Sequence, residues 1–389
     1  MTGPISLDLA WQRLLNYATP LASERIPADE CCGRYLADDV IAQRSQPSHD
    51  LSAMDGYAVS GDEPWSVVGE SRAGLPYGAS LKSREAVLIS TGAHCPAGTD
   101  AILIKENAVL DGDMVRSSET PSPGRHIRRQ GFDFEYGQTV LSKGIAIGPA
   151  QIAVARSAGH RSLSVGRQPT VAIIECGDEL VADPQNCPPD RLPASNGAML
   201  AAMAEGCGAR IIRIGPVSDE ADKLAEAFGN AAAADLVVTS GGASVGDHDL
   251  VRPVLLELGA EIDFWKVAIR PGKPLLLARR GAQVILGLPG NPVSSYVTAF
   301  LFLLPLIRQM QAANSPLPHA HFLPIATAIE PGGERREFLR GKFGEKGIIP
   351  ITERDSSALA SLSHADVLID RAIDAPAAKA GMAVPCYIL

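Results

Sequence analysis

Between Pro169 and residue 315, short apolar runs alternate with longer segments that carry helical patterns. The runs at 171–174, 211–214, 236–239, 275–277 and 284–286 predict strands, and the segments at 219–228 and 249–258 predict helices. Such alternation favours a doubly wound α/β domain with a parallel sheet. No other feature of the chain limits the fold as strongly.

Two further helices in this region have recognisable starting residues. Ser195 and Asn196 come before one helix, and Asn291 with Pro292 comes before the last and longest one. Side chains of Ser and Asn can accept a hydrogen bond from a free backbone N–H, and Pro suits the first helical position. The most apolar part of the last helix, 297–307, is too short to span a bilayer.

The remaining sequence predicts three more domains, which suits a chain of 389 residues. Residues 1–45 and 126–168 are predicted to form one discontinuous mixed domain, with helices near the N-terminus, at 28–36 and at 149–158. Residues 46–125 contain short apolar runs between Gly and Pro turns, which favours an inserted β-rich domain. Residues 316–389 are predicted to form a small C-terminal β domain that begins with a linker at 316–324.

Composition excludes several classes of protein. The net charge of −9 argues against a general nucleic-acid or membrane-surface protein. The odd number of cysteines, seven, argues against a disulfide framework, and the N-terminus lacks a signal-peptide pattern. A cytoplasmic protein is therefore predicted, and any basic groups that bind an anion must be local.

Polar motifs follow several of the predicted strands. Glu175-Cys176-Gly177-Asp178-Glu179 follows the first strand, and Ser240-Gly241-Gly242 follows the strand at 236–239, with Asp247 and Asp249 soon after. Ligands of open α/β domains bind beyond these strand ends. Glycine turns with hydroxyls suit a phosphate, and carboxylates suit a divalent cation. Each motif alone is equally compatible with an ordinary turn and a solvated acidic pair.

Basic side chains come from a neighbouring segment, in which Lys266, Arg270 and Lys273 lie close in sequence. The predicted inserted domain offers Asp55 and Thr91, and the return crossing offers Arg128, Arg129 and Asp133. Solvated surface charge and turn formation are the ordinary explanations for each of these groups. Their number, together with the strand-end motifs, favours a binding site.

Taken together, these motifs resemble those of the molybdopterin molybdenumtransferase family (MoeA and the E domain of gephyrin), in the same order and over essentially the whole chain. The five segments that carry the resemblance are Ser52-Ala53-Met54-Asp55-Gly56-Tyr57-Ala58, Gly177-Asp178-Glu179-Leu180, Ser240-Gly241-Gly242-Ala243-Ser244-Val245-Gly246, Pro271-Gly272-Lys273-Pro274 and Gly287-Leu288-Pro289-Gly290-Asn291-Pro292.

The resemblance implies an elongated homodimer that inserts molybdate into adenylylated molybdopterin, with Mg²⁺-dependent release of AMP. It implies that each site combines the α/β domain of one subunit with the inserted domain of the other. Transient partners would be the molybdopterin adenylyltransferase and apo-molybdoenzymes or their cofactor chaperones, and neither nucleic acid nor a membrane is implied.

The resemblance also implies roles for individual residues. Catalytic roles fall to Asp55, Thr91, Glu179, Asp219 and Asp249, of which Glu179, Asp219 and Asp249 would hold the metal. Substrate-binding roles fall to Arg128, Asp133, Ser240, Gly241, Gly242, Lys266, Arg270, Lys273, Arg340 and Ser357. The match is loosest around Arg340 and Ser357.

Two positions depart from the family pattern. Cys176 stands where relatives usually have Ser or Thr, and a thiol is the weaker hydrogen-bond donor. Arg270 stands where Lys is frequent, which keeps the charge but offers a planar fork. Either change could tune the choice between molybdate and tungstate. The alternative functions are a molybdopterin adenylyltransferase-like activity and a non-catalytic scaffold for cofactor intermediates.

Overall fold

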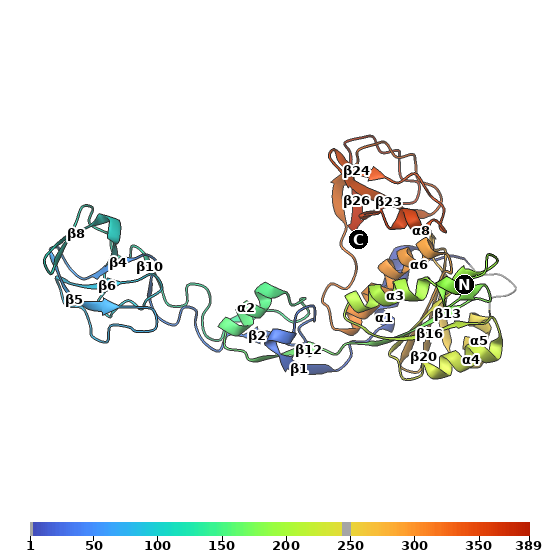
Figure 1. Ribbon diagram of the computed structural model, residues 1–389, viewed down its shortest axis with the longest axis horizontal. Helices are drawn as coiled ribbons and strands as arrows, with labels where there is room; N and C mark the ends of the chain where they lie inside the picture. Colours follow the sequence, from blue (N-terminus) through green and yellow to red (C-terminus); the bar gives the residue numbers. More distant parts are fainter. Residues whose placement is uncertain (1–2, 243–249) are drawn as a thin grey trace.

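The computed structural model describes residues 3–242 and 250–389. The chain is elongated: the inserted domain lies at one end, and the α/β domain and the C-terminal domain lie together at the other (Figure 1). A narrow middle region, which contains β1, β2, β12 and α2, joins the two ends. The architecture is thus multidomain, with one α/β unit and several β-rich units, as predicted.

The α/β domain is built on a six-stranded sheet of order β16-β13-β17-β21-β20-β18. The strands are β16 (Arg210–Val217), β13 (Thr170–Cys176), β17 (Leu236–Ser240), β21 (Gln283–Leu288), β20 (Pro274–Arg280) and β18 (Glu261–Lys266). The first four are parallel, and β20 runs antiparallel to both of its neighbours, β21 and β18, so the prediction of a parallel sheet was wrong at β20. Only Gly281 and Ala282 separate β20 from β21, which is too short for a parallel crossover.

Helices cover both faces of this sheet, so the doubly wound arrangement is confirmed. Along β13, Ile173 packs with one core cluster and Ile174 with another, because successive side chains of a strand point to opposite faces. The helices are α3 (Asn196–Gly206), α4 (Ala221–Asn230), α5 (Val251–Glu257), α6 (Pro292–Thr298), the π-helical η4 (Ala299–Leu303) and α7 (Leu304–Met310).

The continuous helical stretch Pro292–Met310 is long and apolar enough to cross a membrane by length and composition. However, 78% of it is buried inside the protein, where Val297, Leu301 and Ile307 belong to the main core cluster. It is therefore the core helix of a soluble fold.

The N-terminal segment is divided between two parts of the molecule. Helix α1 (Leu7–Tyr17) packs Leu7 and Leu14 into the main core of the α/β domain. The following residues join the middle region through β1 (Ser23–Pro27) paired with β12 (Ser162–Gly166), and β2 (Val40–Ile41) paired with β11 (Thr139–Leu141). The expected helix α2 (Pro149–Ser157) completes it.

The predicted helix at 28–36 is wrong. A single 3-10 turn, η1 (Ala28–Glu30), forms there, and Gly33 then adopts a φ of +80°. Beyond this turn the backbone is extended, and the Leu36 N–H donates to the Ile145 carbonyl at 3.1 Å. Pairing with the returning chain therefore overrides the local helical preference.

The inserted domain contains a six-stranded sheet of order β7-β4-β6-β5-β9-β8. The chain enters and leaves it side by side, because β3 (Leu51–Ser52) pairs with β10 (Ile127–Arg128). The sheet consists of β4 (Gly56–Val59), β5 (Trp65–Ser71), β6 (Glu85–Ile89), β7 (Ala101–Ile104), β8 (Ala108–Asp111) and β9 (Met114–Ser117), with the 3-10 turn η2 (Lys105–Asn107).

The C-terminal domain is a small β unit that shares a sheet with the α/β domain. Strand β19 (Ile269–Arg270) leaves the α/β domain and pairs in parallel with β23 of the C-terminal domain. The predicted linker at 316–324 ends in a strand, β22. The elements are β22 (His321–Pro324), β23 (Arg336–Gly344), β24 (Gly347–Pro350), α8 (Leu359–Leu362), β25 (Val367–Arg371) and β26 (Ala383–Ile388).

Candidate active site

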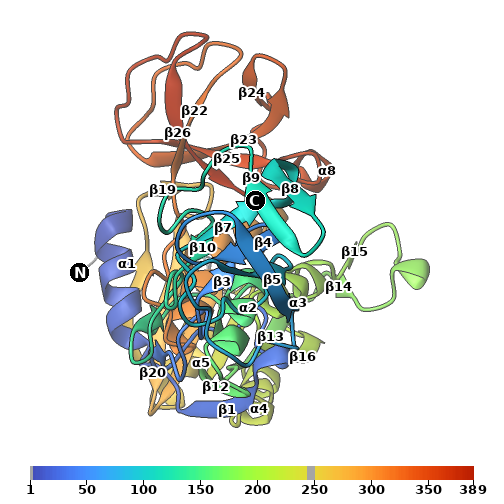
Figure 2. The same ribbon diagram turned by 90° about the vertical axis from the view of Figure 1, so that its left-hand side faces the viewer.

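A cavity of about 680 Å³ lies at the carboxyl ends of β13 and β17, and we call it the strand-end cavity. It is bounded by the turn before α6, by the C-terminal domain and by a projecting segment that carries β14 (Leu180–Val181), η3 (Pro184–Asn186) and β15 (Leu192–Pro193) (Figure 2). The predicted site residues that line it are Glu179, Asp219, Gly241, Gly242 and Ser357. The strand-end motifs therefore converge.

The glycine turn after β17 is a steric requirement. Gly241 has a φ of +90°, and a Cβ there would lie 2.4 Å from the Cys176 carbonyl oxygen. Gly242 also has a positive φ, +65°. Only glycine adopts such backbone angles without strain, so the cavity floor forms where the sequence places Gly241-Gly242.

We expect Gly241→Ala to lower the free energy of local opening of the β13–β17 strand pair by roughly 1–3 kcal/mol. Alanine would be strained at this φ, and its methyl group would collide with a carbonyl. Amide hydrogen exchange in the two strands measures this. Gly290→Ala is the matched control, since a Cβ at Gly290 would lie 3.5 Å from the nearest atom, an ordinary contact. Equal exchange in both variants would contradict the steric explanation.

Asn196 fixes the geometry of the strand-end cavity. Its Nδ2 donates to Ser240 Oγ at 3.0 Å and to the Gly290 carbonyl at 2.6 Å, so three separate segments are joined. The expected capping role of Ser195 and Asn196 is not observed, since the start of α3 has no side-chain cap hydrogen bond. Tertiary partners take the amide instead.

Asn291 shows the same change of role. It is the residue before α6, but its side chain makes no capping hydrogen bond. Its Nδ2 instead donates to Ser356 Oγ at 3.0 Å, and the Val293 N–H donates to the Ser356 carbonyl at 3.0 Å. These contacts hold the C-terminal domain against the start of α6 and place Ser357 at the cavity.

Carboxylates stand at the rim of the strand-end cavity. The Asp219 N–H donates to Asp178 Oδ1 at 3.1 Å, and the Asp178 N–H donates to Asp219 Oδ2 at 3.4 Å, so the two loops hold each other. Glu179 is exposed beside them. Within the described parts of the chain, no group of three or more His, Cys, Asp or Glu side chains could hold a metal. The third predicted metal residue, Asp249, lies outside the described residues.

A second cavity, of about 390 Å³, lies between the α/β and C-terminal domains, and we call it the interdomain cavity. It adjoins the first, because Pro274 and Ser294 line both. Five basic and three acidic side chains line it: Arg270, Lys273, Arg335, Arg340 and Arg354, with Glu337, Glu353 and Asp355. An excess of basic groups in a concave site attracts anions.

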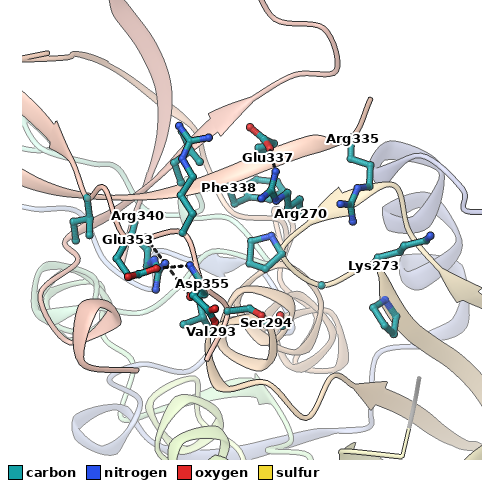
Figure 3. Close-up of a pocket in the computed structure, with 17 residues that line it drawn as sticks. Arg270, Lys273, Val293, Ser294, Arg335, Glu337, Phe338, Arg340, Glu353 and Asp355 are labelled. Atoms are coloured by element: carbon teal, nitrogen blue, oxygen red, sulfur yellow. Dashed lines mark hydrogen bonds and ion pairs between the residues drawn. The ribbon is translucent and has the colours of Figure 1, made fainter. Parts of the chain in front are cut away.

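The basic side chains of the interdomain cavity differ in whether they already form an ion pair with an acidic side chain of the protein. Arg270 Nη1 pairs with Glu337 Oε1 at 3.1 Å, so its charge is partly compensated. Figure 3 shows Lys273 and Arg335 on the same side of the cavity. Among the residues that the structure describes, neither makes an ion pair with an acidic side chain, so both remain available to an incoming oxyanion.

Arg340 is buried, and its guanidinium donates hydrogen bonds to residues of its own C-terminal domain. It donates to the Asp355 and Ala358 carbonyls at 3.2 Å each, to Ser361 Oγ at 2.5 Å and to the Glu353 carbonyl. Burial lowers the pKa of this guanidinium. The structure thus shows Arg340 holding the loop that carries Ser357, which itself donates to Asp355 Oδ1 through its hydroxyl at 2.7 Å.

Lys266 lies on β18, and it is absent from the lining of both cavities. Its Nζ lies 4.6 Å from the centre of the Trp265 ring, and the Arg252 guanidinium lies 3.9 Å from the same ring. Two cations therefore contact one half-buried aromatic side chain. Of the predicted basic triad, the structure brings only Arg270 and Lys273 to one cavity.

Asp55 and Thr91 form a unit in the inserted domain. The N–H and the hydroxyl of Thr91 donate to Asp55 Oδ1 at 2.7 and 2.8 Å. These two hydrogen bonds lower the pKa of Asp55. Both residues are exposed, and their domain lies at the opposite end of the chain from the two cavities (Figure 1). Within one chain, they cannot meet Glu179 or Lys273.

We expect Thr91→Ala to raise the pKa of Asp55 toward its ordinary value, because one of two donors to the carboxylate is lost. A lowered pKa means that Asp55 stays ionised below its ordinary pKa and becomes protonated only as the pH falls through the lower folded value. The acid titration of Asp55, followed by carboxyl ¹³C NMR, should therefore move to higher pH. Thr99→Ala is the control, since that hydroxyl donates to the Pro96 carbonyl.

Arg128 and Asp133 lie on the crossing back from the inserted domain, and both are exposed. Arg128 pairs through its backbone with Leu51, and the Asp133 N–H donates to the Gln46 carbonyl at 2.9 Å. Next to them, Arg129 forms an ion pair with Asp50 at 2.5 Å. These residues accompany the Asp55 unit and lie far from the cavities of the same chain (Figure 1).

Three residues that the structure brings to the cavities were given no site role from the sequence. Glu175 and Asn196 line the strand-end cavity, and Arg335 lines the interdomain cavity. Glu175 was noted in a strand-end motif but was assigned no role of its own, and the neighbouring pair Arg335-Arg336 could have indicated a basic site. No local signal indicates Asn196, whose pattern is that of an ordinary helix start.

The sequence matches three known families along its length. The MoeA N-terminal region (domain I and II) matches residues 5–159 and a probable molybdopterin binding domain matches residues 172–309. The MoeA C-terminal region (domain IV) matches residues 323–389. A molybdopterin molybdenumtransferase of Haemophilus influenzae is 35% identical over 358 residues, which cover 89% of this chain and 88% of that protein.

Other relatives agree. A molybdopterin molybdenumtransferase of a Nostoc species is 38% identical over 292 residues, covering 72% of this chain and 67% of that one. The solved structure of a molybdopterin biosynthesis MoeA protein from Pyrococcus horikosii is 27% identical, with a TM-score of 0.81 and 99% of both chains covered. A second such structure, from Pyrococcus horikoshii OT3, has a TM-score of 0.87 at 23% identity over 100% of both chains.

Proposed function

Since this chain belongs to the MoeA family of molybdopterin molybdenumtransferases, enzymes of molybdenum cofactor biosynthesis, we propose that it takes adenylylated molybdopterin, inserts molybdate and releases AMP and molybdenum cofactor. The observation that carries the proposal is the pair of adjoining cavities. One has a glycine floor and an acidic rim, and the other has an excess of basic groups. A phosphate-linked substrate that binds with a metal ion and a separate oxyanion need two adjoining sites of this kind, one acidic and one basic.

We assign the interdomain cavity to molybdate. Molybdate is a doubly charged oxyanion, and charge-assisted hydrogen bonds are the strongest means of holding one. Lys273 and Arg335 can supply them, and Arg270 can exchange Glu337 for the anion. Arg340 supports the site indirectly, because it fixes the loop that carries Ser357. In this assignment, Lys266 acts from outside the cavity, on the potential around the substrate.

We assign the strand-end cavity to the molybdopterin part of the substrate and to Mg²⁺. Glu179 and Asp219 provide hard oxygen ligands at its rim, which fits Mg²⁺, an ion that keeps several waters and often uses only one or two carboxylates beside phosphates. When bound, the ion would neutralise charge on the pyrophosphate and make its hydrolysis easier. Asp249 would join them as implied by the family pattern.

A homodimer would complete each site. Asp55 and Thr91 are held as a unit, face solvent and lie at the far end of the chain from both cavities. A two-fold partner would place its own inserted domain at this chain's cavities, and the reverse contact follows from symmetry. Leu192, a largely exposed apolar side chain at the cavity rim, offers contact area for such a partner. A cytoplasmic location fits this proposal.

Two other functions are less well supported. A molybdopterin adenylyltransferase would need only the α/β domain, whereas the relatives resemble this chain over most of its length, including the inserted domain. A scaffold would need neither an acidic rim nor unpaired basic groups. The adenylyltransferase and apo-molybdoenzymes remain the proposed transient partners of the enzyme.

The decisive experiment incubates the purified protein with adenylylated molybdopterin, Mg²⁺ and micromolar molybdate. AMP release and the activation of an added apo-molybdoenzyme are measured in the same samples. Both are expected, and both should depend on Mg²⁺. AMP release without activation of the apo-enzyme would show hydrolysis only, and absence of both would reject the proposal.

A further inference from the structure

Glu175, at the end of β13, is a buried carboxylate to which the proposed function assigns no role. It is 4% exposed and lines the strand-end cavity. With respect to residues 3–242 and 250–389, its side chain has no hydrogen bond or ion pair. Buried charges are normally paired, because desolvation is costly. An unpaired carboxylate that faces a cavity therefore indicates a missing ligand.

The surroundings of Glu175 favour negative charge at this place. A Cβ added to Gly197 would lie 2.4 Å from Glu175 Oε2, so the carboxylate lies against the first turn of α3. The amino end of a helix carries partial positive charge. The same position is 3.6 Å from Arg213 Nη2, which belongs to the neighbouring strand β16. Gly197 thus leaves the room that the carboxylate occupies.

A second acceptor without a partner among the described residues belongs to Asn196, the residue before Gly197. Asn196 is 8% exposed, and its Oδ1 has no hydrogen bond within the described residues. The amide cannot simply be reversed, because its Nδ2 already donates to Ser240 Oγ and to the Gly290 carbonyl. Glu175 and Asn196 both line the strand-end cavity, and each has acceptor oxygens without a partner among the described residues. They are complementary to a ligand edge made of N–H donors.

We propose that the Glu175 carboxylate recognises the pterin ring by accepting hydrogen bonds from its 2-amino group and the adjacent ring N3–H. This inference rests on the proposed function for the identity of the substrate. The two oxygens of a carboxylate match two parallel N–H donors, the arrangement that makes such pairs strong and specific. Recognition at this edge orients the rest of the substrate toward the acidic rim.

The same chemistry excludes the other ring of the substrate. The exposed edge of adenine presents one amino donor beside an acceptor nitrogen. A carboxylate facing that edge would make one hydrogen bond and meet one repulsive lone pair. Glu175 therefore assigns the pterin, and not the adenylyl group, to the inner end of the strand-end cavity.

The test measures binding by the full-length protein of 6-hydroxymethylpterin, followed through the ligand's own fluorescence, and of AMP, followed by calorimetry. Glu175→Gln is expected to weaken pterin binding about 10- to 100-fold, the range for a hydrogen bond to a charged group, and to leave the AMP Kd within about twofold. Glu205→Gln, which removes an exposed carboxylate from α3, the helix that Glu175 lies against, should change neither Kd.

A change in the ligand probes the same contact. Pteridin-4(3H)-one lacks the 2-amino group, so it should bind the unchanged protein at least about 10-fold more weakly than the pterin. In Glu175→Gln, the difference between the two ligands should shrink, because the charged acceptor is gone. An undiminished difference in Glu175→Gln would overturn the proposal.

Gly197→Ala provides an independent variant that keeps the carboxylate. The added methyl would displace the end of the Glu175 side chain, while alanine suits a helix better than glycine. We expect Gly197→Ala to bind the pterin more weakly while its thermal stability stays unchanged. If Gly197→Ala bound the pterin with the same Kd as the unchanged protein, the placement of the Glu175 carboxylate at the pterin would be contradicted.

Three other outcomes decide the matter. Loss of AMP binding in Glu175→Gln equal to the loss of pterin binding would move Glu175 to the metal or phosphate and overturn the inference. Absence of saturable pterin binding by the unchanged protein at millimolar ligand would also overturn it. Pterin binding that depends on Glu175, in a protein that releases no AMP from adenylylated molybdopterin, would reject the proposed function and leave the inference standing.

Discussion

Glu179→Ala is expected to slow AMP release from adenylylated molybdopterin at least about 100-fold at saturating Mg²⁺, the size of effect seen when a group that stabilises charge in the transition state is removed. Glu179 is exposed at the rim of the strand-end cavity, beside Asp219. Because it is exposed, its removal should leave thermal stability nearly unchanged.

The control for this variant is Asp178→Asn. The Asp178 carboxylate accepts the Asp219 N–H at 3.1 Å, and an amide oxygen can do the same. Asp178 is also absent from the lining of the strand-end cavity. We therefore expect AMP release within a few-fold of the unchanged protein. If Glu179→Ala kept more than half of the activity at every Mg²⁺ concentration, the acidic rim would not be the metal site.

The second large effect is a recovery of activity on mixing two inactive variants. Asp55→Ala and Glu179→Ala should each be nearly inactive alone, since each lacks one half of every site. After the two are unfolded and refolded together, half of the dimers are mixed, and each mixed dimer has one intact site of two. The expected activity is about a quarter of that of the unchanged protein.

A control mixture uses two variants from the same half of the site. Mixing Glu179→Ala with Asp219→Ala should restore nothing, because each composite site would still lack one of the two carboxylates. Recovery in this mixture, or its absence in the mixture with Asp55→Ala, would mean that the sites are not shared between subunits. Sedimentation of each sample confirms that dimers have formed.

Much of the fold could be predicted because its signals are local. Alternating apolar runs from residue 171 onward gave strands that the structure contains, and Ile173 and Ile174 indeed pack on opposite faces. The direction of β20 was misread because apolar content says nothing about direction. Attention to the Gly281-Ala282 pair would have corrected this, since two residues permit only a hairpin.

The site was less predictable because its key contacts join distant segments. Asn196 and Asn291 have the pattern of helix caps, but their partners are Ser240, Gly290 and Ser356, up to 94 residues away. Tertiary hydrogen bonds outweighed local capping. One cavity has an acidic rim and the other an excess of basic groups, and this difference depends on the pairing of β23 with β19. No residue near either strand in the sequence specifies that pairing.

The shared sheet formed by β19 and β23 has an evolutionary consequence. In a chain of independent modules, recombination can remove one unit and leave the others soluble. Here, a truncation at residue 316 would expose the edge of β19 and the anion-binding side of the α/β domain, and would unpair Arg270 from Glu337. We therefore expect the C-terminal domain to be inherited together with the α/β domain, with selection acting on the two as one heritable unit.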